Sequence, residues 1–234
     1  IDRLEIGSAR VSEGEKVGLR SILEWAEHRG CLERMEILGF VDGGKSADWI
    51  RGCGGKVLNL LAKGSETHCR VQLRKEPEQH FSDVCREIEQ ARKMGLAVNV
   101  YLEDWSNGMI DSLPYVFEFL HRLSEMEIER VMLPDTLGIL TPEQVTRYLD
   151  WVYAAAPNLR IDFHGHNDYG LVTANSLAAV QAGVSGIHVT VNGLGERTGN
   201  QSLAQLVVAI NDHTERATRV VEKELLHASI MVQT

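Results

Sequence analysis

The chain has 234 residues, and 24 Lys and Arg residues against 33 Asp and Glu residues give it a net charge of −9. Its contents of 44% hydrophobic and 24% charged residues are typical of a globular protein and argue against disorder. The acidic excess, without any cluster of Lys and Arg, disfavours binding to nucleic acid or to anionic membranes.

Other sequence features bear on the location of the protein and on the completeness of the chain. No apolar run approaches the roughly 18 residues that a membrane span needs, and the first residues resemble neither a signal nor a transit peptide. The four cysteines show no C-x-x-C spacing, so we expect free thiols and a cytoplasmic location. The chain begins at Ile1 and not at Met, so we expect it to be a fragment.

Hydrophobic periodicity predicts strands and helices that alternate along the chain. Seven strands are expected, at residues 4–7, 35–41, 56–61, 97–102, 130–133, 159–163 and 186–191. Seven helices are expected, at residues 15–28, 46–53, 81–94, 111–126, 142–156, 171–182 and 202–211. End signals support three of these helices: Ser46 as an N-cap, Gly95 as a C-terminal stop, and a capping box formed by Thr141 and Gln144.

This alternation indicates a parallel α/β fold. A doubly wound sheet usually has five or six strands, whereas a (β/α)8 TIM barrel has eight units in roughly 250 residues. We therefore predict a TIM barrel with seven of its eight βα units present. We expect residues 1–212 to form this catalytic barrel without its first strand, and residues 213–234 to form a tail, helical over 225–232, that leads into a further region.

Catalytic groups of such barrels lie at the carboxyl ends of the strands. The sixth strand ends in HGHND, where His164 and His166 share one face and can bind a divalent cation. The next strand leads into NGLGERTGN, where Asn200 can offer an oxygen to the same cation. The alternatives are a hydrogen-bonded pair of histidines and a tight glycine turn.

Two further strand ends carry candidate groups. Glu103 shares a face with Tyr101 and can act as a general base, although a solvated loop acid is an equally good interpretation of this residue alone. Thr136 can donate its hydroxyl to a substrate carboxylate or merely hold its turn.

The segments HGHND, NGLGERTGN and LPDTLG, in their positions on successive strands, resemble the metal-dependent acyltransferases that make 2-alkylmalates. These are the 2-isopropylmalate, citramalate and homocitrate synthases, which belong to the DRE-TIM metallolyases with an HMG-CoA lyase-like barrel. The stretches EILGFVDG, KVLNLLAKGS and VYLEDWSNG are most similar to citramalate synthase. The resemblance implies a Claisen condensation of acetyl-CoA with a 2-oxo acid in leucine or isoleucine biosynthesis.

The resemblance also implies roles for particular residues and partners. His164 and His166 would bind Mn²⁺, Mg²⁺ or Zn²⁺, with Asn200 completing or supporting the site, and Glu103 would deprotonate the acetyl-CoA methyl group. Thr136 would bind the carboxylate of the 2-oxo acid. The pocket for the oxo-acid side chain would be lined by Leu38, Leu61 and Tyr101, a bulky set that suits the methyl group of pyruvate. The protein would be a homodimer.

The chain departs from the family pattern in two respects. The first-strand motif D-x-T-L-R-D-G does not occur, and the chain stops before the downstream subdomain that contributes to the acetyl-CoA site. We therefore expect an incomplete metal site and no activity from this chain alone. Two alternatives stay open: a carbon–carbon lyase of the HMG-CoA lyase type, whose glycine loop carries a Cys where this chain has GLGERTGN, and an inactive barrel fragment that serves as a binding module.

Overall fold

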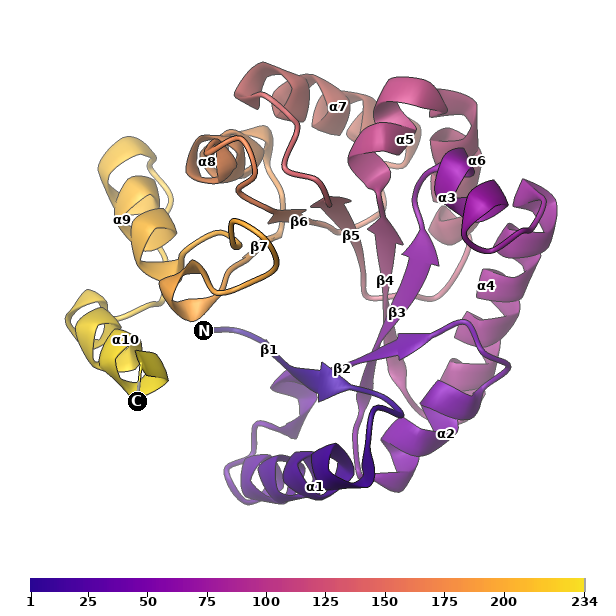
Figure 1. Ribbon diagram of the computed structural model, residues 1–234, viewed down its shortest axis with the longest axis horizontal. Helices are drawn as coiled ribbons and strands as arrows, with labels where there is room; N and C mark the ends of the chain where they lie inside the picture. Colours follow the sequence, from indigo (N-terminus) through magenta and orange to yellow (C-terminus); the bar gives the residue numbers. More distant parts are fainter. Residues whose placement is uncertain (234) are drawn as a thin grey trace.

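Seven parallel strands form one curled sheet in the computed structural model, which describes residues 1–233 (Figure 1). The strands are β1 (Leu4–Ser8), β2 (Met35–Phe40), β3 (Val57–Lys63), β4 (Ala97–Glu103), β5 (Arg130–Asp135), β6 (Ile161–Gly165) and β7 (Gly186–His188). They pair in sequence order, and within the described residues β1 is not hydrogen-bonded to β7. The prediction of a partial (β/α)8 barrel with seven strands is therefore confirmed.

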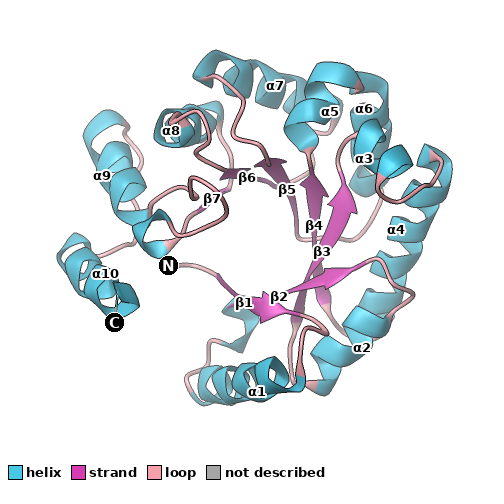
Figure 2. Cartoon of the chain, in the orientation of Figure 1, coloured by secondary structure: helices cyan, strands magenta, loops and turns pink. Residues whose placement is uncertain are grey.

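The helices lie around the outside of this curled sheet (Figure 2). They are α1 (Glu13–His28), α2 (Lys45–Gly52), α3 (Glu66–Val71), α4 (Pro77–Lys93), α5 (Trp105–Asp111), α6 (Leu113–Ser124), α7 (Pro142–Ala155), α8 (Val172–Ala182), α9 (Leu203–His213) and α10 (Leu225–Gln233). Short 3₁₀ turns occupy Leu32–Arg34, Val191–Gly193 and Glu222–Glu224. Among residues 1–233, no helix has both the length and the apolar character that crossing a membrane requires.

The ends of the helices follow local hydrogen-bonding chemistry. The predicted capping box of α7 is confirmed, since the Thr141 hydroxyl accepts from the Gln144 amide and the Gln144 side chain accepts from the Thr141 amide. The prediction of Ser46 as an N-cap is wrong. Helix α2 begins at Lys45 after Gly44, whose φ of 84° suits glycine, and the Ser46 hydroxyl instead accepts from the Phe40 amide.

Two helices and several strand ends differ from the sequence prediction. Helices α3 and α5 were not predicted; they are six and seven residues long, too short for a clear hydrophobic period. Strands β3 and β4 continue to Lys63 and Glu103, beyond their predicted ends. Strand β7 stops at His188, three residues early, because the chain then turns through Asn192 at a φ of 60°.

The two faces of the sheet differ in polarity. In β3 the outward side chains of Leu58, Leu60 and Ala62 are buried in the main hydrophobic core. The inward positions of β3 include Asn59 and Lys63, which make polar contacts across the barrel interior. Apolar packing against the helices therefore holds the sheet, while the interior remains available for polar groups.

A buried ionic network fills the amino-terminal half of the interior. The Arg130 guanidinium donates to Asp162 at 2.7 Å, to Glu36, and to the Asn99 side-chain oxygen at 3.3 Å. Asn99 in turn donates to Asn59 at 2.7 Å. A buried cation needs such paired and hydrogen-bonded partners, so this layer fixes the relative positions of β2 to β6 beneath the site.

The chain after α9 packs beside the loop that follows β7. The predicted helix over residues 225–232 is confirmed as α10, and the Asn192 side chain donates to the Ser229 carbonyl at 3.1 Å. The division into a barrel of residues 1–212 and a tail of residues 213–234 stays a prediction, and residue 234 lies outside the described residues.

Candidate active site

Two histidine rings meet at the carboxyl end of β6. His164 is in the strand and His166 follows it, and their Nε2 atoms lie 3.2 Å apart. Within residues 1–233 the buried Nδ1 atoms of both rings have no hydrogen-bond partner. Burial lowers the pKa of His164 well below its usual range, and it also lowers the pKa of His166, with nearby Arg197 adding to the latter effect. Both rings are thus held in the neutral form that coordinates metal ions.

Asn200 lies next to this pair. It forms an isolated antiparallel bridge with His166, and its side-chain amide donates to the Leu194 carbonyl at 3.1 Å. Its buried Oδ1 atom has no hydrogen-bond partner in the described chain, so this neighbour of His166 keeps a free acceptor. Within residues 1–233, no third His, Cys, Asp or Glu side chain is placed so that it could hold a metal ion together with His164 and His166. Two neutral imidazoles and one amide oxygen nonetheless fit a divalent cation with open positions.

Glu103 ends β4 and faces the barrel mouth. It pairs in register with Lys63 at the end of β3, and the Lys63 ammonium donates to its Oε2 atom. The Glu103 side chain is 27% exposed, so a substrate can reach it. The structure places Glu103 two residues beyond Tyr101 on the same strand but records no contact between Glu103 and the histidine pair.

Thr136, which follows β5, is linked to the end of β4. Its hydroxyl oxygen accepts from the Asp104 amide at 2.8 Å, so its own hydrogen remains available to a ligand. Asp104 has a φ of 66° and is buried, and its carboxylate accepts from Ser65 at 2.6 Å and from Asn107 at 2.8 Å. These bonds fix the turn that presents Thr136 beside Glu103.

The expected pocket residues lie on adjacent inward positions. Leu38, Leu61 and Tyr101 are all half-buried, and Leu61 pairs in register with Tyr101. The Tyr101 ring meets His164 edge-on with centroids 6.2 Å apart. The structure therefore brings Tyr101 next to the histidine pair.

The sequence analysis missed His188. This residue ends β7, pairs in register with His164, and lies with its Nδ1 atom 2.9 Å from the Tyr101 hydroxyl. Its Nε2 atom is 3.6 Å from Asp162. Alternation along β7 could have shown that this side chain points inward, but the predicted strand was too long to mark His188 as its end.

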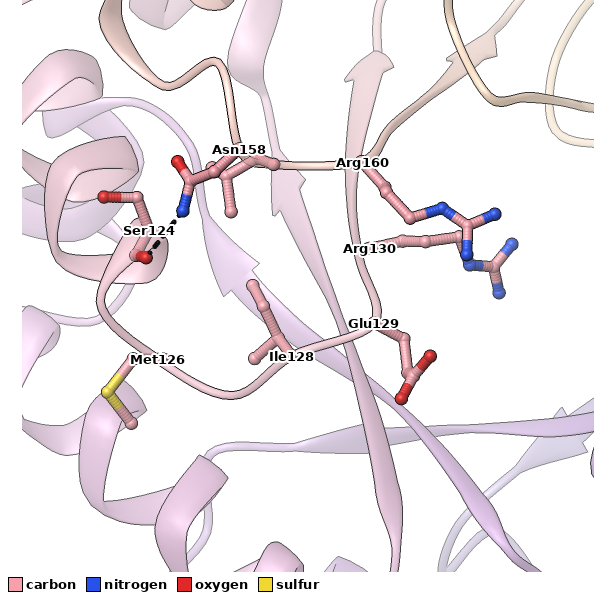
Figure 3. Close-up of a pocket in the computed structure, with 8 residues that line it drawn as sticks. Ser124, Met126, Ile128, Glu129, Arg130, Asn158 and Arg160 are labelled. Carbon is pink, nitrogen blue, oxygen red and sulfur yellow. Dashed lines mark hydrogen bonds between the residues drawn. The ribbon is translucent and has the colours of Figure 1, made fainter.

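A hollow at the opposite end of the strands is not part of this site. Figure 3 shows it beside the chain that enters β5, with Arg130 and Arg160 among its lining residues and Asn158 donating to the Ser124 carbonyl at 2.9 Å. In this barrel architecture, active sites lie at the other end, so we assign the hollow no catalytic role.

His80, which lies on α4, holds the backbone at the end of β3. Its Nε2 atom accepts from the Lys63 amide at 3.1 Å, which requires a neutral ring. Burial, together with the charge of Lys75, lowers the pKa of His80 to about 4.

This geometry predicts a pH-dependent loss of stability. The unfolded chain takes up a proton below about pH 6.5 and the folded chain only near pH 4, so stability should fall as the pH drops through this window. Between pH 7 and pH 5 the contribution of His80 should decrease by about 2 kcal/mol. Urea unfolding at both pH values should show a smaller decrease for His80→Gln than for the wild type. Equal decreases would contradict this assignment.

Comparison with known proteins agrees with this architecture. Residues 1–232 match the HMGL-like family, so the chain belongs to that family. It is 30% identical over 233 residues to the (R)-citramalate synthase of Methanocaldococcus jannaschii, covering 99% of this chain and 45% of the relative. It is also 30% identical over 237 residues to the 2-isopropylmalate synthase of Saccharolobus solfataricus, covering 99% of this chain and 58% of that relative. The chain spans about half the length of the curated relatives it matches.

Solved structures share the fold. Hydroxymethylglutaryl-CoA lyase from Pseudomonas aeruginosa superposes with a TM-score of 0.80 at 19% identity, covering 99% of this chain and 80% of that one. An HMG-CoA lyase from Acinetobacter baumannii, in complex with coenzyme A and 3-methylmalate, gives a TM-score of 0.74 at 22% identity and covers 99% and 78%. At these identities the likeness shows the fold alone.

Proposed function

We propose that this chain forms the barrel of a 2-alkylmalate synthase, which condenses acetyl-CoA with a 2-oxo acid. The observation that carries the proposal is the convergence of the His164 and His166 Nε2 atoms, 3.2 Å apart at the barrel mouth. The named synthases among the relatives support this choice of reaction. The expected homodimer and the cytoplasmic location remain predictions.

The first task of the site is to bind the 2-oxo acid. A divalent cation held by His164, His166 and Asn200 would supply Lewis acidity toward the ketone and carboxylate oxygens. Thr136 can donate its free hydroxyl hydrogen to the carboxylate, because its oxygen already accepts from the Asp104 amide. This arrangement fixes which end of the oxo acid faces β5 and which faces the histidines.

The second task is to deprotonate the methyl group of acetyl-CoA. Glu103 is the candidate base because it ends β4 at the mouth and is partly exposed. Its position is held by the ion pair with Lys63 and by strand pairing. Attack of the resulting carbon nucleophile on the ketone forms the new carbon–carbon bond, and thioester hydrolysis releases CoA.

The pocket wall supports pyruvate as the 2-oxo acid. Leu38, Leu61 and Tyr101 form a bulky set that suits a small side chain, and the Tyr101 ring is held by its contacts with His188 and His164. Citramalate is then the product. Overfilling a packed site costs roughly 1–3 kcal/mol, or about 5–150-fold in discrimination.

Substrate choice gives a direct prediction. The full-length protein should turn over pyruvate faster than 2-oxoisovalerate at equal concentration. Leu38→Ala or Tyr101→Ala should raise the relative activity on 2-oxoisovalerate by about 5–150-fold, because each removes bulk from the wall. Val17→Ala, an exposed position on α1, is the matched control. If the wild type instead prefers 2-oxoisovalerate, the citramalate assignment is wrong and the product is 2-isopropylmalate.

A carbon–carbon lyase is the second candidate, because HMG-CoA lyases are among the solved structures that share this fold. The loop NGLGERTGN after β7 carries no cysteine, which favours the synthase. Release of free CoA, followed with a thiol reagent in the presence of acetyl-CoA and a panel of 2-oxo acids, tests the proposal in the full-length protein. CoA release that depends on a 2-oxo acid supports the synthase, and its absence with every acid would contradict it.

A further inference from the structure

We propose that Lys63 is a second catalytic residue, whose ammonium group stabilises the enolate oxygen formed from acetyl-CoA. This inference rests on the proposed function. It adds to that function a cation that stabilises the negative charge on the enolate oxygen. Nothing in the sequence analysis singled out Lys63, which was expected to lie beyond its strand.

The first observation is the position of Lys63 beside the candidate base. Lys63 ends β3 and pairs in register with Glu103 at the end of the adjacent strand β4. The Lys63 ammonium donates to the Glu103 carboxylate, and the two side chains are 13% and 27% exposed. Any methyl group that reaches Glu103 must therefore also come close to the Lys63 ammonium.

The second observation is that the backbone of Lys63 is held on both sides by buried rings. Its amide donates to His80 at 3.1 Å, and its carbonyl accepts from the Tyr115 hydroxyl at 2.7 Å. These rings pack against Phe119, with centroids 5.6 Å and 6.2 Å away. Such packing fixes the direction in which the lysine stem leaves the strand, which is what a preorganised electrophile requires.

The third observation is the close approach of the two strands just beyond Lys63. The amide of Gly64 donates to the Glu103 carbonyl at 2.6 Å. A Cβ atom on residue 64 would lie 2.3 Å from the Leu102 carbonyl oxygen, so only glycine fits there. The lysine–glutamate pair is therefore held together by the backbone as well as by its charges.

Cations near the site and beneath it are paired with other carboxylates. Arg197 makes a two-pronged contact with Asp168, at 2.7 and 2.8 Å, and Arg130 is buried between Glu36 and Asp162. Among residues 1–233, Lys63 is the cation that pairs with Glu103. It is therefore the cation best placed to stabilise the negative charge as that charge moves from the Glu103 carboxylate to the thioester oxygen.

The chemical step explains why the pair suits enolisation. The Glu103 carboxylate takes a proton from the methyl carbon, the C–H electron pair becomes the carbon–carbon double bond, and the carbonyl π pair moves onto the thioester oxygen. Glu103 becomes neutral as that oxygen becomes negative, so one negative charge stays beside one ammonium group throughout. Lys63 remains protonated and shifts its hydrogen bond from Glu103 to the enolate oxygen, where such a donor contributes about 10²–10³-fold to the rate.

The test compares Lys63→Met with wild-type full-length protein, using pyruvate and either acetyl-CoA or methyl-deuterated acetyl-CoA. We expect kcat for CoA release to fall about 10²–10³-fold, the KM for pyruvate to stay nearly constant, and the deuterium isotope effect on kcat to rise. Lys63→Arg, which keeps a cation, should recover part of the rate. Lys93→Met, which removes an exposed lysine that pairs with Glu89 on α4, should behave like the wild type.

A double-mutant cycle separates a catalytic lysine from one that only positions the base. In the Glu103→Gln background, adding Lys63→Met should still slow hydrogen–deuterium exchange at the acetyl-CoA methyl group by at least about tenfold. A further loss under about threefold would show that Lys63 acts only through Glu103, and this would overturn the inference. If wild-type protein neither releases CoA nor exchanges the methyl protons, the proposed function itself fails.

Discussion

Replacing His164 or His166 by Ala in the full-length protein should lower CoA release from acetyl-CoA and pyruvate by about 10³-fold or more. The reason is that a metal Lewis acid supplies several kcal/mol of transition-state stabilisation, and about 4 kcal/mol corresponds to that factor. The two Nε2 atoms face each other at 3.2 Å, so the loss of either imidazole removes half of the nitrogen donors at that point. Steady-state kinetics in metal-controlled buffer measures the effect.

The matched control is His121→Ala. His121 lies on the exposed side of α6, with its side chain 65% exposed, and its loss should leave turnover unchanged. Calorimetric titration with Mn²⁺ gives a readout that does not depend on catalysis, and affinity should fall for His164→Ala and His166→Ala but not for the control. Near-normal turnover or unchanged Mn²⁺ affinity in either site variant would refute the ligand assignment.

Glu103→Gln should produce the second large effect, a loss of about 10²–10⁴-fold in exchange of the acetyl-CoA methyl protons with solvent deuterium. The amide keeps the size of the side chain but cannot accept the proton. Binding of the 2-oxo acid should change little, because no contact in the structure joins Glu103 to the histidine pair or to Thr136. Glu118→Gln, which alters an exposed α6 carboxylate paired with Arg122, is the control. If Glu103→Gln leaves the exchange of the methyl protons unchanged, the base must be another group.

How much of the fold could be predicted from the sequence depended on the length of each hydrophobic pattern. Strands and long helices were found because hydrophobic periods of two and of 3.6 residues are strong over such lengths. Helix α7 was the clearest case, since Thr141 and Gln144 satisfy each other's amides locally and need no tertiary information. The helices α3 and α5 were missed because each is only about two turns long, and their residues pack according to the barrel surroundings.

The polar interior of the barrel could not be predicted from the sequence. Hydrophobic periodicity predicted the strands, but the inward positions of β3 carry Asn59 and Lys63 and join a polar network. A single strand cannot reveal this, because the partners of its polar groups lie on other strands. Arg130 is the example: its carboxylate partners are 94 and 32 residues away along the chain.

The candidate site was predicted where the signal was local. His164 and His166 are two residues apart, so strand geometry alone placed their side chains together. The contacts of Lys63 with Glu103 and of His188 with Tyr101 span 40 and 87 residues. The parallel register of β3 and β4 brings the first pair together, and the curl of the sheet brings β7 close to β4 for the second. The roles given to all of these residues stay predictions until the variants are measured.

The fate of the methyl hydrogens tests the central claim most directly. Full-length protein should be incubated with methyl-deuterated acetyl-CoA, pyruvate and a divalent cation, and the products analysed by mass spectrometry. The account predicts citramalate that retains two deuterons, formed in equal amount with free CoA, because one deuteron leaves to the base and two remain on the methylene carbon that forms the new carbon–carbon bond. No condensation product, together with cleavage of HMG-CoA to acetyl-CoA and acetoacetate, would contradict the synthase and establish the lyase.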